Sequence, residues 1–194
     1  ANFVTIGGDA IHAPSGTGCL FIRHGTKCSP FILGGIEQGG HRAGSYSVAG
    51  LAALGEAARE ADDARDLMCT EVARLRARFE AEIVAKIPEA RVLFQESERL
   101  PNTSAIAFPG VGNEALLYLL NRRGVFASIG GGSFQQIGLV LIGSGIPEAE
   151  AHSAVSFSLS RETTEDQVDR AIAIIVDCVA RLRKVSREFY PGSR

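Results

Sequence analysis

"RLPNTSAIAFPGVGNEALLYLL", residues 99–120, places a strand pattern directly before a helix pattern. Apolar residues alternate through 103–110, which is typical of a strand with one buried face. The following segment, "GNEALLYLLNRRG", repeats apolar residues at helical spacing, with Gly112 or Asn113 at its start and Gly124 beyond its end. The stretch therefore predicts one strand–helix step of an α+β layer.

The rest of the second half continues this pattern. Further strands are predicted in "ARVLFQ", "VFASI" and "AVSFSLS", at 90–95, 125–129 and 154–160. Thr164 and Gln167 have the spacing of a capping box, which predicts the start of a last helix running to about Glu188. One stripe of that helix is apolar: Val168, Ile172, Ile175, Val179 and Leu182. We expect a small α+β domain over roughly 89–190.

The first half is less complete. Residues 3–6 and 18–22 are predicted strands on either side of the glycine-rich "GGDAIHAPSGTG", and 29–44 is a glycine-dense loop. A helical region follows over 46–86, with a break at "EADDAR" near residue 62 and an end at Pro88. Two strands, a loop and a helix do not make a domain. We therefore expect another chain, or residues upstream, to supply the neighbouring strands.

Composition narrows the class of protein. The chain has 194 residues, 45% hydrophobic and 22% charged, with a net charge of −2, which is typical of a globular domain and gives no electrostatic case for nucleic acid or membrane partners. The four cysteines lack metal-binding spacing, and Cys69 and Cys178, inside helical patterns, are predicted core thiols. The histidines are scattered, so no metal site is expected. Reduced thiols favour the cytoplasm.

Four blocks of the sequence resemble one family in the same order. They are "IHAPSGTGCLFIR" at 11–23, "GGIEQGGHRAGSYSVAGLAALGEA" at 34–57, the opening stretch at 99–120, and "AHSAVSFSLSRETTEDQVDRAI" at 151–172. Together they resemble the C-terminal half of the cysteine desulfurases (NifS/IscS-like) in the class V aminotransferase family. The resemblance implies an α/β protein of the PLP-dependent transferase fold type I. It would comprise a partial large domain at 1–61 and a connecting helix with an α+β small domain at 62–194.

The resemblance also implies where pyridoxal phosphate (PLP) chemistry would lie. Such enzymes hold PLP on a lysine, store sulfur on a cysteine thiolate and bind the substrate carboxylate with an arginine. The lysine position falls on Ala10, in the pair Asp9-Ala10, the cysteine position falls on Ser133, and the arginine position falls on Ser156. These substitutions leave no catalytic residue, and Ser133 in "GGGSF" has no base placed beside it by the sequence.

Other family positions keep their character. Arg42 is retained, and Ser45 replaces a threonine whose hydroxyl, in the family, contacts the phosphate of the neighbouring subunit's PLP. With His41 they are the candidate cofactor-binding residues, contacting a phosphate across a dimer. Lys27, which follows the strand, is predicted to be a surface residue rather than a substitute for the lost lysine. We expect no covalently bound PLP. PLP binding is expected only on the strength of the family resemblance, or in a site that this chain shares with a partner chain.

Two functions remain open from the sequence. The chain is either a non-catalytic structural or regulatory subunit in sulfur or iron–sulfur metabolism, or one chain of a split PLP enzyme that completes a shared site. Both imply a homodimer or a hetero-oligomer, with a desulfurase-like N-terminal half or an active desulfurase as the partner.

Overall fold

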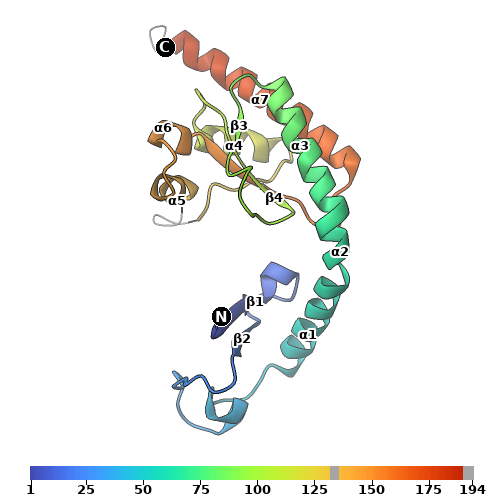
Figure 1. The fold of residues 1–194 in the computed structure, drawn as a ribbon, viewed down its shortest axis with the longest axis vertical. Coiled ribbons are helices and arrows are strands. Elements are labelled where there is room, and N and C mark those ends of the chain that lie inside the picture. The colour runs from blue at the N-terminus through green and yellow to red at the C-terminus, as the bar shows by residue number, and fades with distance from the viewer. Residues whose placement is uncertain (132–135, 190–194) are drawn as a thin grey trace. The chain divides into compact units, whose positions relative to one another are not determined.

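The chain divides into two units, Ala1–Arg65 and Asp66–Arg194. The computed structural model describes residues 1–131 and 136–189 (Figure 1). In the first unit, β1 (Phe3–Gly7) pairs antiparallel with β2 (Gly18–Ile22), and η1 (Gly8–Ile11) connects them. A loop containing η2 (Glu37–Gly40) leads to α1 (Val48–Asp63). The two strands are confirmed, and the predicted helix break occurs at Ala64, which directly follows the last residue of α1.

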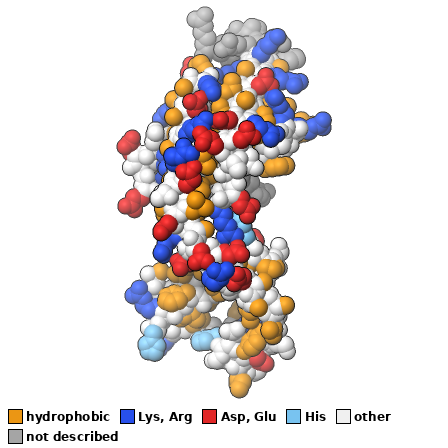
Figure 2. All heavy atoms as spheres, turned by 90° about the vertical axis from the view of Figure 1, so that its right-hand side faces the viewer, with side chains coloured by type: hydrophobic (Ala, Val, Ile, Leu, Met, Phe, Trp, Pro, Cys, Tyr) orange, Lys and Arg blue, Asp and Glu red, His pale blue; other side chains and the backbone are white. Residues whose placement is uncertain are grey.

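The first unit buries few apolar side chains. Its core cluster consists of Ala13, Leu54 and Ala57, with Ile11 packed against it. The register places Phe3 opposite Ile22 and Val4 opposite Phe21, on opposite faces of the ribbon. These two faces are both apolar and both exposed: Phe3 46%, Val4 41%, Ile6 38%, Leu20 48% and Phe21 54%. Apolar side chains at the surface of this unit are visible in Figure 2. Strands that are apolar on both faces are typical of sheets covered on both faces.

The second unit is built on a three-stranded antiparallel sheet. Its strands are β3 (Arg91–Val92), β4 (Thr103–Ala107) and β5 (Ala154–Ser158), in the order β3-β4-β5. A continuous helical run leads into it: α2 (Arg65–Leu67), the π-helical η3 (Met68–Val72) and α3 (Ala73–Lys86). The remaining helices are α4 (Asn113–Arg122), α5 (Ile137–Gly143), α6 (Glu148–Ala151) and α7 (Glu165–Phe189).

The core of the second unit lies between the sheet and helices α3, α4 and α7. Helices α3 and α7 lie side by side (Figure 1). The predicted stripe of α7 is confirmed, because Val168, Ile172, Ile175 and Val179 are buried and Leu182 packs against the same cluster. The other helices and β5 contribute Phe79, Ile83, Leu116, Leu120, Val155 and Phe157.

Several predictions about the second unit are wrong. "ARVLFQ" forms a strand only at Arg91–Val92, because Phe94 has a φ of 55°, which turns the chain out of the sheet. "VFASI" forms a single bridge, Ser128 to Ser156, and among the described residues no main-chain hydrogen bond joins the next pair of that register, Phe126 and Ser158. Helices α5 and α6 were not expected.

Of the two predicted core cysteines, one is buried and one is exposed. Cys178 is buried at 2% exposure, as predicted. Cys69 is exposed, which makes the prediction of a core thiol wrong there. It lies in the π-helical η3, where the helical phase that would have buried it is shifted.

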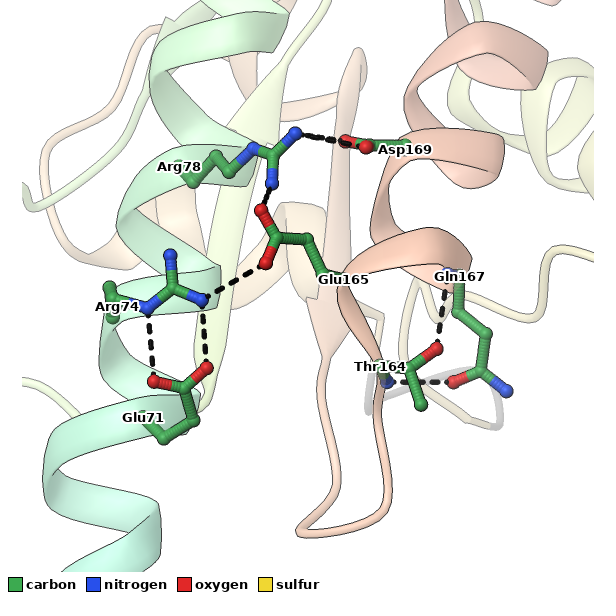
Figure 3. Close-up of polar contacts among 7 residues, drawn as sticks. All are labelled: Glu71, Arg74, Arg78, Thr164, Glu165, Gln167 and Asp169. Atoms are coloured by element: carbon green, nitrogen blue, oxygen red, sulfur yellow. Dashed lines mark hydrogen bonds and ion pairs between the residues drawn. The ribbon is translucent and has the colours of Figure 1, made fainter.

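Helices α3 and α7 are also joined by ion pairs (Figure 3). Arg78 donates to both carboxylate oxygens of Asp169, at 2.7 and 2.9 Å, and pairs with Glu165. Arg74 bridges Glu71 and Glu165, and its hydrogen bond holds the pKa of Glu71 below its ordinary value.

The predicted capping box at the start of α7 is confirmed. The Thr164 N–H donates to Gln167 Oε1 at 3.0 Å, and the Gln167 N–H donates to Thr164 Oγ1 at 3.3 Å (Figure 3). These bonds satisfy main-chain donors that a helix start would otherwise leave without partners.

Within residues 1–131 and 136–189, no helix combines the length and the apolar character needed to cross a bilayer. The same part of the chain holds no cluster of three or more His, Cys, Asp or Glu side chains suited to a metal ion.

We expect Ile175→Ala to lower the free energy of unfolding of the second unit by about 2–5 kcal/mol, because it leaves a cavity in the core. Val185→Ala on the same helix is the matched control, since Val185 is 42% exposed, and should change stability by less than about 0.5 kcal/mol. Urea unfolding followed by circular dichroism measures both. Equal losses would contradict the assignment of the core.

Candidate functional site

The glycine-rich turn between β1 and β2 is closed by main-chain hydrogen bonds. The Gly8 N–H donates to the Thr17 carbonyl at 2.9 Å, and the Ala13 N–H donates to the Gly8 carbonyl at 2.8 Å. A Cβ atom at Gly8 would overlap the Thr17 hydroxyl, so only glycine leaves room for this contact. Thr17 Oγ1 in turn donates to the Pro14 carbonyl at 2.6 Å. The turn therefore has one defined conformation set by Gly8 and Thr17.

Ala10 lies in the middle of η1 and is exposed, as is Asp9 beside it. The 3₁₀ turn η1 ends at Ile11, and His12 after it adopts the left-handed conformation, with a φ of 69°. The turn thus presents the side chain at position 10 to its surroundings, and that side chain is a methyl group.

The second glycine-rich segment, around residues 34–46, is braced by its own side chains. Arg42 Nη1 donates to the carbonyls of Gly44 and Ser45, at 2.9 and 3.2 Å. Glu37 Oε2 accepts from the Gly44 N–H at 3.2 Å. The Gln38 N–H donates to the Tyr46 hydroxyl at 3.0 Å. The structure therefore brings Arg42 and Ser45 together, with the hydroxyl-bearing Ser45 at the surface.

Sequence reasoning missed the two braces of this loop, Glu37 and Tyr46. Glu37 could have been identified from the sequence, because it is a carboxylate surrounded by glycines in "GGIEQGG". The main-chain N–H groups of such a loop need hydrogen-bond acceptors. His41, which was predicted to contact a phosphate, is exposed, and its main-chain N–H donates to the Gln38 carbonyl at 3.3 Å.

The remaining predicted positions belong to the second unit. Ser156 lies in the middle of β5, where its main chain exchanges two hydrogen bonds with Ser128, at 2.8 and 2.9 Å. Its side chain points to the face opposite the buried Val155 and Phe157. Ser133 lies outside the described residues. The structure thus groups Arg42 and Ser45 on one loop, with Ala10 on another turn of the same unit and Ser156 on the other unit.

Lys27 and Lys86 are both exposed. Lys27, at which a surface position was predicted, is exposed in the segment after β2. Lys86 pairs with Glu82 at 2.7 Å on α3 in the second unit.

The chain matches known proteins over almost all of its length. The sequence profile of the family described as "Aminotransferase class-V" matches residues 1–171. The cysteine desulfurase NifS of Azotobacter vinelandii is 41% identical over 189 residues, which cover 95% of this chain and 47% of that protein. A cysteine desulfurase of Gluconacetobacter diazotrophicus is 37% identical, over 99% of this chain and 48% of that protein. The chain spans about half the length of these relatives.

Solved structures agree on the fold. A "NIFS-LIKE PROTEIN" superposes with a TM-score of 0.84 at 24% identity, over 93% of this chain and 47% of that one. A NifS-like protein from Rickettsia africae superposes with a TM-score of 0.81 at 25% identity, over 91% of this chain and 47% of that one. The expected partial fold type I architecture is therefore confirmed.

We expect Glu37→Ala to loosen the loop at 34–46, because it removes the acceptor of the Gly44 N–H. Loss of one such hydrogen bond should speed hydrogen exchange of the Gly44 amide about tenfold. Asp9→Ala is the matched control, an exposed carboxylate of the same unit outside this loop. Amide exchange followed by NMR distinguishes them, and unchanged exchange in Glu37→Ala would refute the bracing role.

Proposed function

The chain belongs to the aminotransferase class V family as a cysteine desulfurase-like partial chain, and we propose that it performs no desulfurase chemistry of its own. We infer a structural or regulatory subunit in sulfur or iron–sulfur metabolism. Its role is to present the scaffold of this half of the fold to a partner chain.

The observation that carries this proposal is the turn around Ala10. Gly8, Thr17 and Pro14 hold the turn closed, with Gly7 opposite Gly18 in the strand register. The backbone that would position an amine is therefore in place, while the side chain at position 10 is a methyl group. Loss of the chemical group with retention of the turn supports a role that depends on shape.

Two further positions support the same reading. Ser156 offers a hydroxyl where the family resemblance assigns the carboxylate-binding arginine, and a hydroxyl cannot form the bidentate ion pair. Ser133 offers a hydroxyl where a thiolate would store sulfur. Each substitution removes a different step, namely cofactor attachment, sulfur transfer and substrate binding.

The chain's own residues do not fit covalently held PLP at this turn. A Schiff base requires a lysine amine, and Ala10 provides none. PLP stays in the proposal only as a ligand of a site shared with another chain, next to Ser45 and Arg42.

Ala10→Lys tests how much of the attachment site the turn retains. We expect the wild-type chain, incubated with PLP, to show no aldimine absorbance band that borohydride can fix, and to release no sulfide from cysteine above free PLP. Ala10→Lys should gain the band, because the turn already positions the side chain. Ser15→Lys, an exposed position of the same turn, is the matched control and should not.

The results that would overturn the proposal are specific. Sulfide release from cysteine by the purified wild-type chain, with PLP fixed on it by borohydride, would show that the chain is catalytic. An equal band in both lysine variants would show that the turn does not select position 10.

A second function is favoured by the apolar ribbon of β1 and β2. Its side chains are exposed on both faces, as in a strand pair taken from the interior of a sheet. We infer that a partner chain supplying neighbouring strands and a lysine would complete a split PLP enzyme. In that case Ser45 and Arg42 would contribute to the partner's phosphate site.

Reconstitution with a desulfurase-like partner chain that supplies the missing strands together with a lysine and a cysteine tests this alternative, because an N-terminal half alone contains no residue for the position of Ala10. If it holds, the mixture releases sulfide, and Ser45→Ala lowers the PLP affinity of the complex about tenfold, because one phosphate hydrogen bond is lost. Ser29→Ala, an exposed serine of the same unit, is the control. A complex without sulfide release, or with activity unaffected by Ser45→Ala, would exclude the split enzyme.

A further inference from the structure

A hollow of about 440 Å³ lies in the second unit, between the first turns of α7, the end of β5 and the segment 123–126. Its volume falls in the range of small-molecule pockets, roughly 300–1,000 Å³. It lies beyond the isolated bridge of Ser128 with Ser156, and it is lined by the next pair of that register, Phe126 and Ser158.

Main-chain polar groups face this hollow. Ser156 exchanges its hydrogen bonds with Ser128, so the N–H and C=O of Ser158, two residues on, point to the same edge of β5. Among the described residues, no main-chain hydrogen bond joins Ser158 to Phe126. A donor and an acceptor therefore remain at the wall of the hollow, where both residues line it.

The walls combine apolar surface with positive charge. Phe157 and Val168 provide buried apolar surface, and Phe126 stands 82% exposed at the edge. Arg123 and Arg170 line the same hollow, and no described lining residue is Asp or Glu. The local charge thus selects for an anion.

The two arginines differ in how they are engaged. Arg123 pairs with Asp177 and contacts Cys178 Sγ at 3.7 Å, both outside the lining. Within the described residues, Arg170 has no ion-pair or hydrogen-bond partner, so its guanidinium is available to a ligand. The side-chain amide nitrogen of Gln167 takes no part in the capping box, which uses the Oε1 atom and the main-chain N–H of this residue.

We propose that this hollow binds a small organic carboxylate with an apolar body. The apolar part lies against Phe126, Phe157 and Val168, and the carboxylate accepts from Arg170. The proposal goes beyond the proposed function, because neither the glycine-rich turn nor the loop of Ser45 contributes to the hollow.

Titration of the full chain with 3-phenylpropionate, followed by ¹⁵N NMR, tests the proposal. We expect amide shifts centred on Phe126, Ser158 and Arg170, with a dissociation constant of about 1 mM, given the few atoms of the probe. The neutral 3-phenylpropanamide should bind about five- to tenfold more weakly, because it lacks the charge-assisted hydrogen bond.

Variants at position 170 identify the cation. Arg170→Gln should weaken 3-phenylpropionate about five- to tenfold and abolish the difference between acid and amide, whereas Arg170→Lys should keep the difference. Arg181→Gln, an exposed arginine of the same helix outside the lining, is the matched control and should bind as the wild type does. Equal binding of acid and amide to the wild type, shifts centred elsewhere, or no shifts at 10 mM (about tenfold above the expected constant) would each overturn the proposal.

Discussion

The contact of α7 with α3 and the sheet is the interaction on which the second unit depends. Ile83 and Ile175 are fully buried where these helices pack, and Phe157 brings β5 into the same cluster, with its ring centroid 5.2 Å from that of Phe79. Dispersion and burial in such a cluster outweigh exposed ion pairs of the kind that join Arg78 to Asp169, each of which contributes at most about 1 kcal/mol. The ion pairs fix the orientation of two helices that the apolar stripe already holds together.

The first unit follows a different rule. Its shape comes from hydrogen bonds within short loops, at Gly8 and Thr17 and again at Glu37 and Gly44, while its own core is limited to a few small side chains. Such bonds define a conformation without supplying much net stability. The first unit is thus locally well defined and, within the described residues, poor in buried apolar area.

Much of this could be predicted from the sequence, where the pattern is local and periodic. The stripe of α7, the capping box at Thr164 and the two strands around the glycine-rich turn all follow from spacing that neighbouring residues determine. The failures have a different cause. "VFASI" has strand-like residues, but among the described residues it pairs with β5 only at Ser128, and pairing with a distant strand is not encoded in the segment itself.

In the candidate site, too, local features could be predicted from the sequence and features that depend on how the chain folds back could not. Ala10 and Ser156 were placed by resemblance of motifs, and the strand or turn around each is as expected. The bracing of the Ser45 loop by Glu37 and Tyr46 was not foreseen, because it depends on how a loop of many glycines folds back on itself. Cys69 was misplaced because a π-helical segment shifts the phase of the helix, a change that the residue pattern does not announce.

The exposed ribbon of β1 and β2 also limits the concentration at which the chain stays free of self-association. Within residues 1–131 and 136–189, each strand has its partner on one side only, and the side chains on both faces are apolar, so two copies present matching edges and matching faces to each other. Unprotected edges of this kind template the addition of further strands, and exposed apolar edge strands are sites where self-association can begin. The yield of monodisperse chain should therefore fall as its concentration rises, and the β1 edge is the first place to introduce a lysine if the chain is to be kept apart from its copies.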